Sequence, residues 1–499
     1  MVKSSLLSTT REAIRESPRE LFNWYLIFCT LATSFSGVAK GFDEGNIASI
    51  VVMPVFMKKF GVSHQTEDEY ANTKGWIVSI ATAGAVFGCL SCSWLNSRLG
   101  RKKTLLLYTI IYIAGVLGQT GFGIGGTTVV PSIYLSEIAP KPIRGLITVQ
   151  YAACQQLGVV FGFFLNYGVT KYHAGTQLQW QLPTALQVVP AVIWGIAVLF
   201  IAESPRWLLS VNRRSEAITN LTRIRGLPVD NPYVASELSA IDLQIQHEAD
   251  VETLGVVENR RRFWLMFLAH LFGQWSGANA ITQYSPTILG YLGIAGTETK
   301  FLTTGIYGIV KFVSVVLFAF FIVDFIGRAT NGMSAKEIAN SATLRHTSTA
   351  AIVAIFLHAV AWSIGWFSAP YLINAEIFPI RIRSLNMSFM MAMHWLYYFG
   401  CSRAMPSLLA ATHRWGAFVF FASICAVSLV FVFFCMPETA GRSLESMDTL
   451  FERPLWHIRK VAYPTKVDLM LDAGRRESED GWEDAEKAAA ITEQREVAR

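Results

Sequence analysis

The sequence LSEIAPKPIRG at positions 135–145 recurs in altered form as NAEIFPIRIRS at positions 374–384. In each copy a glutamate precedes an arginine by seven residues, Glu137 before Arg144 and Glu376 before Arg383. Two more pairs keep the same order: RLGRKK at 98–103 matches DFIGRA at 324–329, and ESPRW at 203–207 matches PETAGRSLE at 437–445. Parallel repeats of this length predict two related halves that rock around a central site.

The composition predicts that both halves lie in a membrane. Of the 499 residues, 52% are hydrophobic and 16% are charged, which is too apolar for a soluble protein of this length. Uncharged stretches long enough to cross about 30 Å of hydrocarbon alternate with short basic loops. Nine spans are predicted at 22–42, 75–95, 146–168, 183–202, 263–290, 301–326, 349–373, 384–410 and 416–436.

The stretch 104–136 does not fit this pattern, because its 33 uncharged residues are long for one helix and short for two. Counted as one crossing, it gives ten spans and places the arginine-rich loop at 203–262 outside, against the positive-inside rule. A re-entrant hairpin would remove the conflict in the first half. By the same count a ninth span is missing after Gly327-Arg328. We therefore interpret the chain as a product with internal deletions, which need not transport.

The charge distribution predicts five segments. They are a cytoplasmic tail (1–21), an N-terminal membrane half (22–202), a cytoplasmic central loop (203–262), a C-terminal membrane half (263–436) and a cytoplasmic tail (437–499). The net charge of +6 comes from loops and indicates no nucleic-acid partner. The seven cysteines have no metal-ligand spacing, and we interpret them as packing residues.

The repeated motifs resemble those of the sugar porter family of the major facilitator superfamily, in particular its fungal members, from about position 41 to position 445. GFDEGNIASI at 41–50, QLGVVFG at 156–162 and GQWSGANAITQYSPTIL at 273–289 extend the match. The resemblance implies an all-α membrane protein with the major facilitator fold, of which about 10 spans are readable where the family has 12. It also implies secondary active transport of a monosaccharide or a sugar-like acid, such as a quinate-like compound.

The resemblance also implies substrate-binding residues at matching motif positions. Amide and hydroxyl side chains with aromatic platforms suit a buried ligand that is rich in hydroxyl groups. These positions hold Gln156, Gln274, Asn279, Tyr284, His394 and Trp395. For the polar residues the alternative is an interhelical hydrogen bond, and for Tyr284 and Trp395 it is aromatic packing. Gly273, Gln283 and His394 depart from the family pattern, so the pocket need not prefer glucose.

Two ionisable residues inside predicted spans are costly to bury and therefore indicate function. Asp43 resembles the first-span aspartate that takes the coupling proton in family symporters, although the fourth-span arginine that pairs with it is absent; capping of a helix end is the alternative. Lys311 lies near mid-membrane and requires an anion, either Asp43 or an acidic substrate. Snorkelling to the interface is its alternative.

Charged residues in the loop motifs match the gate network of the family, which bridges the two halves when the transporter faces outward. The matching residues are Arg101, Glu137, Arg144, Arg206, Asp324, Arg328, Glu376 and Arg383. Breaking and remaking such pairs supplies the bistable element that alternating access needs. Ala329 replaces a second arginine, and solvated loop charge without a gating role is the alternative.

We therefore predict a monomeric proton symporter of the plasma membrane with both termini cytoplasmic. It has no cofactor, the proton gradient being its coupling source, and its partners are a small sugar or sugar acid and the lipid bilayer. Export of a small metabolite and sugar sensing without transport are alternative functions. No catalytic triad, metal cluster or phosphate loop is present in the sequence, which argues against an enzyme.

Overall fold

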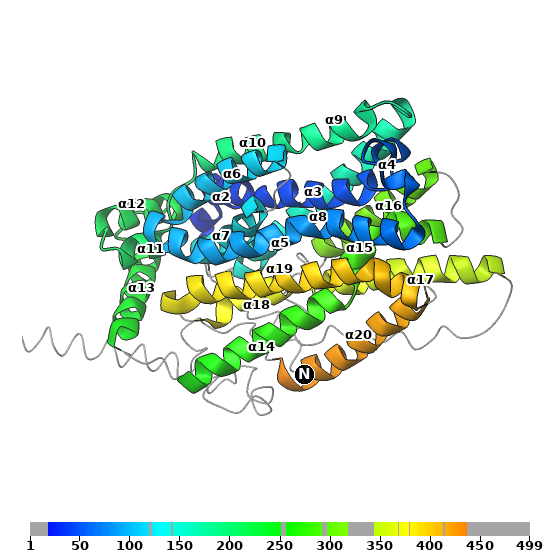
Figure 1. The fold of residues 1–499 in the computed structure, drawn as a ribbon. Helices are drawn as coiled ribbons and strands as arrows, with labels where there is room; N and C mark the ends of the chain where they lie inside the picture. Colours follow the sequence, from blue (N-terminus) through cyan, green and yellow to red (C-terminus); the bar gives the residue numbers. More distant parts are fainter. Residues whose placement is uncertain are drawn as a thin grey trace, which may run out of the picture.

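The computed structural model describes residues 18–118, 122–140, 143–250, 256–291, 297–317, 344–367, 369–378, 380–412 and 415–436. These ranges are helical and contain no strand, which confirms the all-α prediction for them (Figure 1). Five helical stretches are long and apolar enough to cross a membrane: Trp24–Ile50, Glu69–Leu99, Arg144–Tyr172, Leu178–Val198 and Gly416–Cys435.

The N-terminal half is built from helices that mostly follow the predicted spans. They are α2 (Trp24–Ser34), α3 (Ser36–Ile50), α5 (Glu67–Leu99), α6 (Arg101–Gly118), α7 (Phe122–Ile138), α8 (Arg144–Tyr172), α9 (Leu178–Leu186) and α10 (Val188–Val198). Short helices precede α2 and connect α3 to α5: η1 (Arg19–Phe22), α4 (Pro54–Lys59) and η2 (Val62–His64). The first span thus continues to Ile50, eight residues beyond its predicted end at position 42.

The C-terminal half contains α14 (Val256–Trp275), α15 (Ala278–Tyr291), α16 (Thr297–Leu317), α17 (Leu344–Ile364), α18 (Ala369–Ile377), α19 (Ile380–Ala411) and α20 (Trp415–Cys435). Two predicted spans, 263–290 and 349–373, are each broken into two helices. The predicted central loop holds α11 (Pro205–Ser210), α12 (Arg214–Arg225) and α13 (Pro232–Asp250). These three helices gather at one end of the bundle, which we call the central-loop end, whereas α4 lies at the other end, the α4 end (Figure 1).

The stretch 104–136 forms two antiparallel helices, so its count as a single crossing is wrong. Gly123 of α7 lies against Tyr112 of α6, and the far ends of the two helices are joined by an ion pair between Arg101 and Glu137. At about 1.5 Å per residue each helix is slightly shorter than the roughly 30 Å of hydrocarbon. The pair returns the chain to the central-loop end, which removes the conflict with the charge rule in this half.

Helices α16 and α17 run in the same direction, although they follow each other in the chain. The ring of Tyr307 lies 5.6 Å from that of Phe356, and further along both helices Lys311 Nζ lies 4.6 Å from the ring of Trp362. The end of α16 and the start of α17 therefore lie at opposite ends of the bundle. The prediction of a missing ninth span concerns residues between them, at 318–343, which lie outside the described residues.

The two halves meet along two long helix pairs, α5 with α19 and α8 with α16. Inside the N-terminal half, α3 and α8 pack closely through glycines. A Cβ on Gly41 would lie 1.8 Å from the carbonyl oxygen of Gln155, and one on Gly158 would lie 2.2 Å from that of Val38. Small residues allow such backbone contact, which drives helix association in lipid, where no hydrophobic force acts between helices.

We expect Gly41→Ala to separate α3 from α8 and to destabilise the protein, because the new methyl group would collide with backbone rather than with a movable side chain. Overpacking of this kind costs about 1–3 kcal/mol or more. The measurement is the unfolding temperature of the detergent-solubilised protein. Gly168→Ala is the matched control, since nothing lies within 4 Å of a Cβ at that glycine of α8. Equal unfolding temperatures for the two variants would contradict the packing argument.

Candidate functional site

Helix α3 carries three charged residues within one and a half turns, Lys40, Asp43 and Glu44. The side-chain amide of Gln155 on α8 joins two of them. Lys40 Nζ donates to Gln155 Oε1 at 3.1 Å, and Gln155 Nε2 donates to Glu44 Oε2 at 3.3 Å. Because the Gln155 backbone touches Gly41, the glycine packing of α3 on α8 sets this arrangement. Lys40, Glu44 and Gln155 were missed by sequence reasoning, although two of them flank predicted residues.

Two tyrosines of the C-terminal half reach these charges from across the interface. Lys40 Nζ donates to the hydroxyl of Tyr371 on α18 at 3.4 Å, and the hydroxyl of Tyr398 on α19 donates to Glu44 Oε1 at 2.9 Å. All four side chains are buried. Hydrogen bonds to a buried ammonium and to a buried carboxylate therefore join the two halves in the middle of the bundle.

Three of the predicted substrate-binding residues form one hydrogen-bonded cluster. Asn279 Nδ2 donates to Gln274 Oε1 at 2.8 Å, and Gln274 Nε2 lies 3.0 Å from a ring nitrogen of His394. His394 also lies 2.9 Å from the Tyr371 hydroxyl, which links the cluster to Lys40, and 3.3 Å from His270. His270 was not predicted, and its only sequence signal is a polar residue inside an apolar span.

A cavity of about 320 Å³ lies beside α3 between the halves. Its polar lining includes Lys40, Asp43, Glu44, Asn46, Thr82, Gln187 and Gln283, with Trp395 and Tyr398 as aromatic walls. The lining extends to Phe56, Phe60 and Trp180 at the α4 end, whose rings contact one another. This volume is at the lower end of the roughly 300–1,000 Å³ of small-molecule sites, and the mixture of apolar walls with a few polar groups is typical of them.

Two of the predicted residues, Asp43 and Trp395, line this cavity. The other predicted binding residues are not part of its lining, namely Gln156, Gln274, Asn279, Tyr284, Lys311 and His394. Gln156 is buried, and its Oε1 has no hydrogen-bond partner among the described residues. Tyr284 is buried, and its hydroxyl donates to the carbonyl oxygen of Ser402 on α19 at 3.1 Å.

Lys311 is fully enclosed in the bundle, so it does not snorkel to the interface. Its ammonium donates to Thr282 Oγ1 at 2.9 Å and lies 4.6 Å from the ring centre of Trp362. In the described part of the chain no carboxylate lies within 4.0 Å of it, so Asp43 is not its ion-pair partner.

Asp43 lies inside α3, seven residues before the last one, Ile50, and does not cap the helix end. It accepts a hydrogen bond of 2.9 Å from Gln187 Nε2, at the junction of α9 and α10. Among the described residues no arginine pairs with it, which agrees with the absent fourth-span arginine. A neutral amide therefore occupies the place next to this carboxylate.

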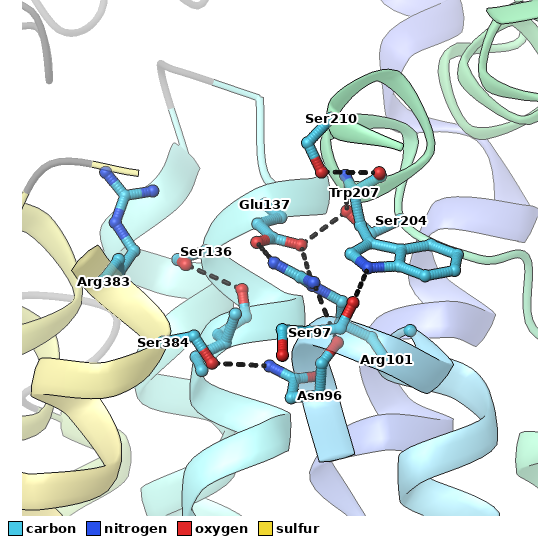
Figure 2. A network of polar contacts seen from close by, with 12 residues as sticks. Asn96, Ser97, Arg101, Ser136, Glu137, Ser204, Trp207, Ser210, Arg383 and Ser384 are labelled. Carbon is cyan, nitrogen blue, oxygen red and sulfur yellow. Dashed lines mark hydrogen bonds and ion pairs between the residues drawn. The ribbon is translucent and has the colours of Figure 1, made fainter. Parts of the chain in front are cut away.

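At the central-loop end, Arg101 and Glu137 form a buried two-pronged ion pair (Figure 2). Arg101 Nη2 lies 2.6 Å and Nε 2.8 Å from the two carboxylate oxygens, and the Ser204 hydroxyl donates to the same carboxylate at 2.5 Å. The pair joins α6 to α7 within the N-terminal half. The gate prediction gives these charges a role between the halves, whereas this ion pair lies within one half.

The position of the Glu203 carboxylate requires a glycine in the RLGRKK motif. Its carboxylate accepts hydrogen bonds from the backbone N–H groups of Arg101 and Lys102, which begin α6. Gly100 has a φ of 84°, and a Cβ there would lie 2.5 Å from Glu203 Oε2. Burial raises the pKa of the Glu203 carboxyl above its usual value. A carboxylate at a helix N-terminus stabilises the free N–H groups of the first turn.

A hydrogen bond from Asn96 Nδ2 to Ser384 Oγ at 3.4 Å crosses between the halves at this end (Figure 2). Arg383 donates to the carbonyl oxygen of Phe378 and attracts Glu137 electrostatically. Arg144 and Arg206 are buried. Asp324, Arg328 and the side chain of Glu376 lie outside the described residues.

These features define a class of protein. Two repeated helical halves have a polar cavity between them, and a hydrogen bond joins the halves at the central-loop end. This is the construction of a secondary transporter rather than of an enzyme. Residues 29–120 and 118–451 match the family described as "Sugar (and other) transporter". The chain belongs to this family and is a multi-pass membrane protein.

Named relatives and solved structures agree with this assignment. The "MFS-type transporter qa-x" of Neurospora crassa is 33% identical and covers 89% of this chain and 92% of its own length. A "Quinate permease" of Neurospora terricola is 33% identical and covers 90% of this chain and 92% of its own length. The proton:xylose symporter XylE, bound to 6-bromo-6-deoxy-D-glucose, matches with a TM-score of 0.74 at 21% identity, covering 86% of this chain and 99% of XylE. The predicted major facilitator fold is confirmed.

We expect Glu137→Ala to destabilise the protein by about 3–5 kcal/mol, because it leaves the buried Arg101 guanidinium without its carboxylate. The side chains of this pair are only 9% and 2% exposed. Glu216→Ala is the control, since its partner Arg213 and Glu216 itself are 46% and 53% exposed, and such a pair contributes about 0–1 kcal/mol. Chemical unfolding of both variants in detergent measures the difference. Similar losses would contradict the assigned role of the buried pair.

Proposed function

We propose that the protein takes up a sugar-like acid of the quinate type together with a proton, by alternating access. The observation that carries this proposal is the cavity beside α3, which combines one ammonium group, two carboxyl groups and several neutral hydrogen-bonding side chains. Neutral donors and acceptors suit the hydroxyl groups of such a compound, and the ammonium suits its carboxylate. The quinate permeases among the relatives support the choice of substrate.

The charges of the cavity support coupling to protons. Lys40, Asp43 and Glu44 have formal charges of +1, −1 and −1, which sum to −1. A carboxylate substrate would bring the sum to −2, whereas a proton that binds with it keeps the sum at −1. Since like charges in a small, poorly hydrated space repel strongly, binding of the acid and of the proton favour each other. Asp43 is the proposed proton acceptor, because among the described residues its hydrogen-bond partner is the neutral amide of Gln187 and not a cation.

The contacts at the central-loop end support the alternating-access part of the proposal. Asn96 and Ser384 join the halves there, whereas the cavity reaches the α4 end. The arginine-rich loop favours a cytoplasmic position for the central-loop end, so this arrangement corresponds to an outward-facing transporter. We propose a monomer in the plasma membrane with both termini in the cytoplasm. It needs no cofactor, since the proton gradient drives the solute.

The test is uptake of radiolabelled solute into proteoliposomes, with quinate, galacturonate, xylose and glucose compared in parallel. We expect quinate to accumulate when the outside is acidic and the accumulation to collapse when a protonophore is added. Accumulation of xylose but not of the acids would identify a neutral sugar as the substrate. Net loss of preloaded solute under the same gradient would indicate the alternative, an exporter, and binding without movement would indicate a sensor.

We expect Asp43→Asn to abolish accumulation driven by the pH gradient while exchange of labelled for unlabelled quinate continues, because the asparagine cannot carry a proton but keeps the hydrogen bond with Gln187. The measurement compares gradient-driven uptake with exchange at equal pH on both sides. Asp230→Asn is the control, since this aspartate is exposed outside the membrane helices. Full gradient-driven accumulation by Asp43→Asn would remove Asp43 from the coupling mechanism.

A further inference from the structure

Three lysines are buried within the bundle at 3%, 3% and 0% exposure: Lys40, Lys74 and Lys311. In the described part of the chain none of them lies within 4.0 Å of a carboxylate. Burial of a cation without an anionic partner costs free energy. A buried lysine of this kind therefore either packs at that cost or binds an anion that enters from outside. The three lysines differ in whether an external anion can reach them.

Only Lys40 lines the cavity, and among the residues that line it Lys40 is the one cation. Lys74 donates to the hydroxyl of Thr287 and lies over the ring of Tyr284 at 5.3 Å. Lys311 is held by Thr282 and lies over Trp362. An anion in the cavity would therefore meet Lys40 first, and not Lys311, the residue that sequence reasoning favoured.

The hydrogen bonds of Lys40 leave room for such an anion. An ammonium has three N–H donors. Among the described residues Lys40 donates to two acceptors, Gln155 Oε1 and the Tyr371 hydroxyl, and both are neutral. The Lys40 ammonium also lies 4.7 Å from the ring centre of Trp395, which forms a wall of the same cavity. One N–H donor of the ammonium thus remains available beside an aromatic surface.

Glu44 does not neutralise Lys40 directly, although it lies one turn further along α3. Its two oxygens accept hydrogen bonds from Gln155 Nε2 and from the Tyr398 hydroxyl. The Gln155 amide separates the two charges and binds both of them. A carboxylate that enters the cavity can therefore contact Lys40 without displacing an existing ion pair.

We propose that Lys40 binds the carboxylate of the substrate and is the residue that selects acids over neutral sugars. Trp395 offers an apolar face to the carbon ring of the same molecule, and Gln187 and Asn46 offer hydrogen-bonding groups for its hydroxyls. This inference rests on the proposed transport of a sugar-like acid and adds the group that recognises the acid.

The experiment compares quinate with its neutral methyl ester as competitors of labelled quinate exchange in proteoliposomes, with binding to the detergent-solubilised protein followed in parallel. The wild type should prefer the acid by at least tenfold. Lys40→Gln should weaken quinate binding by about 10- to 100-fold, the range expected for loss of one hydrogen bond to a charged group, and should change ester binding by less than about threefold. Lys59→Gln is the control, since Lys59 is exposed at the α4 end and does not line the cavity.

Three results would overturn the proposal: a wild type that binds ester and acid equally, a Lys40→Gln variant that keeps the acid preference, or equal weakening of both ligands. Lys40→Met is the second variant, because methionine has an unbranched side chain of similar length without the charge, and the same change in preference is expected of it. A wild type that neither binds nor moves quinate or its ester would instead contradict the proposed function, so the two failures can be told apart.

Discussion

The contact between the backbones of α3 and α8 is the constraint on which the rest of the site depends. Gly41 and Gly158 allow it, since any larger residue at either position would meet a carbonyl oxygen of the opposite helix. Lipid supplies no hydrophobic force between helices, so this packing must hold them together. It brings the Gln155 amide between Lys40 and Glu44, and the amide stabilises two opposite charges that would otherwise be costly to bury.

The charges on α3 also connect the halves. Tyr371 and Tyr398 belong to the C-terminal half, and their hydroxyls bond to Lys40 and Glu44 in the N-terminal half. A rocking motion of the halves would change both bonds, as well as the Asn96–Ser384 contact at the central-loop end. A ligand that binds Lys40 thus acts on the interface that must rearrange. In the proposed mechanism these contacts couple occupancy of the cavity to the position of the halves.

The repeated motifs predicted two related halves and the uncharged stretches predicted most of the helices, but charge was a poor guide to where helices end. Glu137 directly follows the uncharged stretch 104–136 and Arg101 lies shortly before it, whereas both residues belong to the two helices, where they neutralise each other. Motif positions found the Gln274, Asn279 and His394 cluster and Asp43. They did not find Lys40 or Glu44, because only the three-dimensional packing brings these residues to Gln155 and into the cavity. Lys311 was correctly predicted to be buried, but its partner Thr282 is neutral.

The most direct test of this account is an electron cryo-microscopy structure of the full chain in lipid nanodiscs with saturating quinate at acidic pH. We expect ligand density in the cavity beside α3, with the carboxylate in contact with Lys40 and the ring against Trp395. Density at Lys311 between α16 and α17, or a cavity that stays empty while transport is measurable in the same preparation, would contradict it.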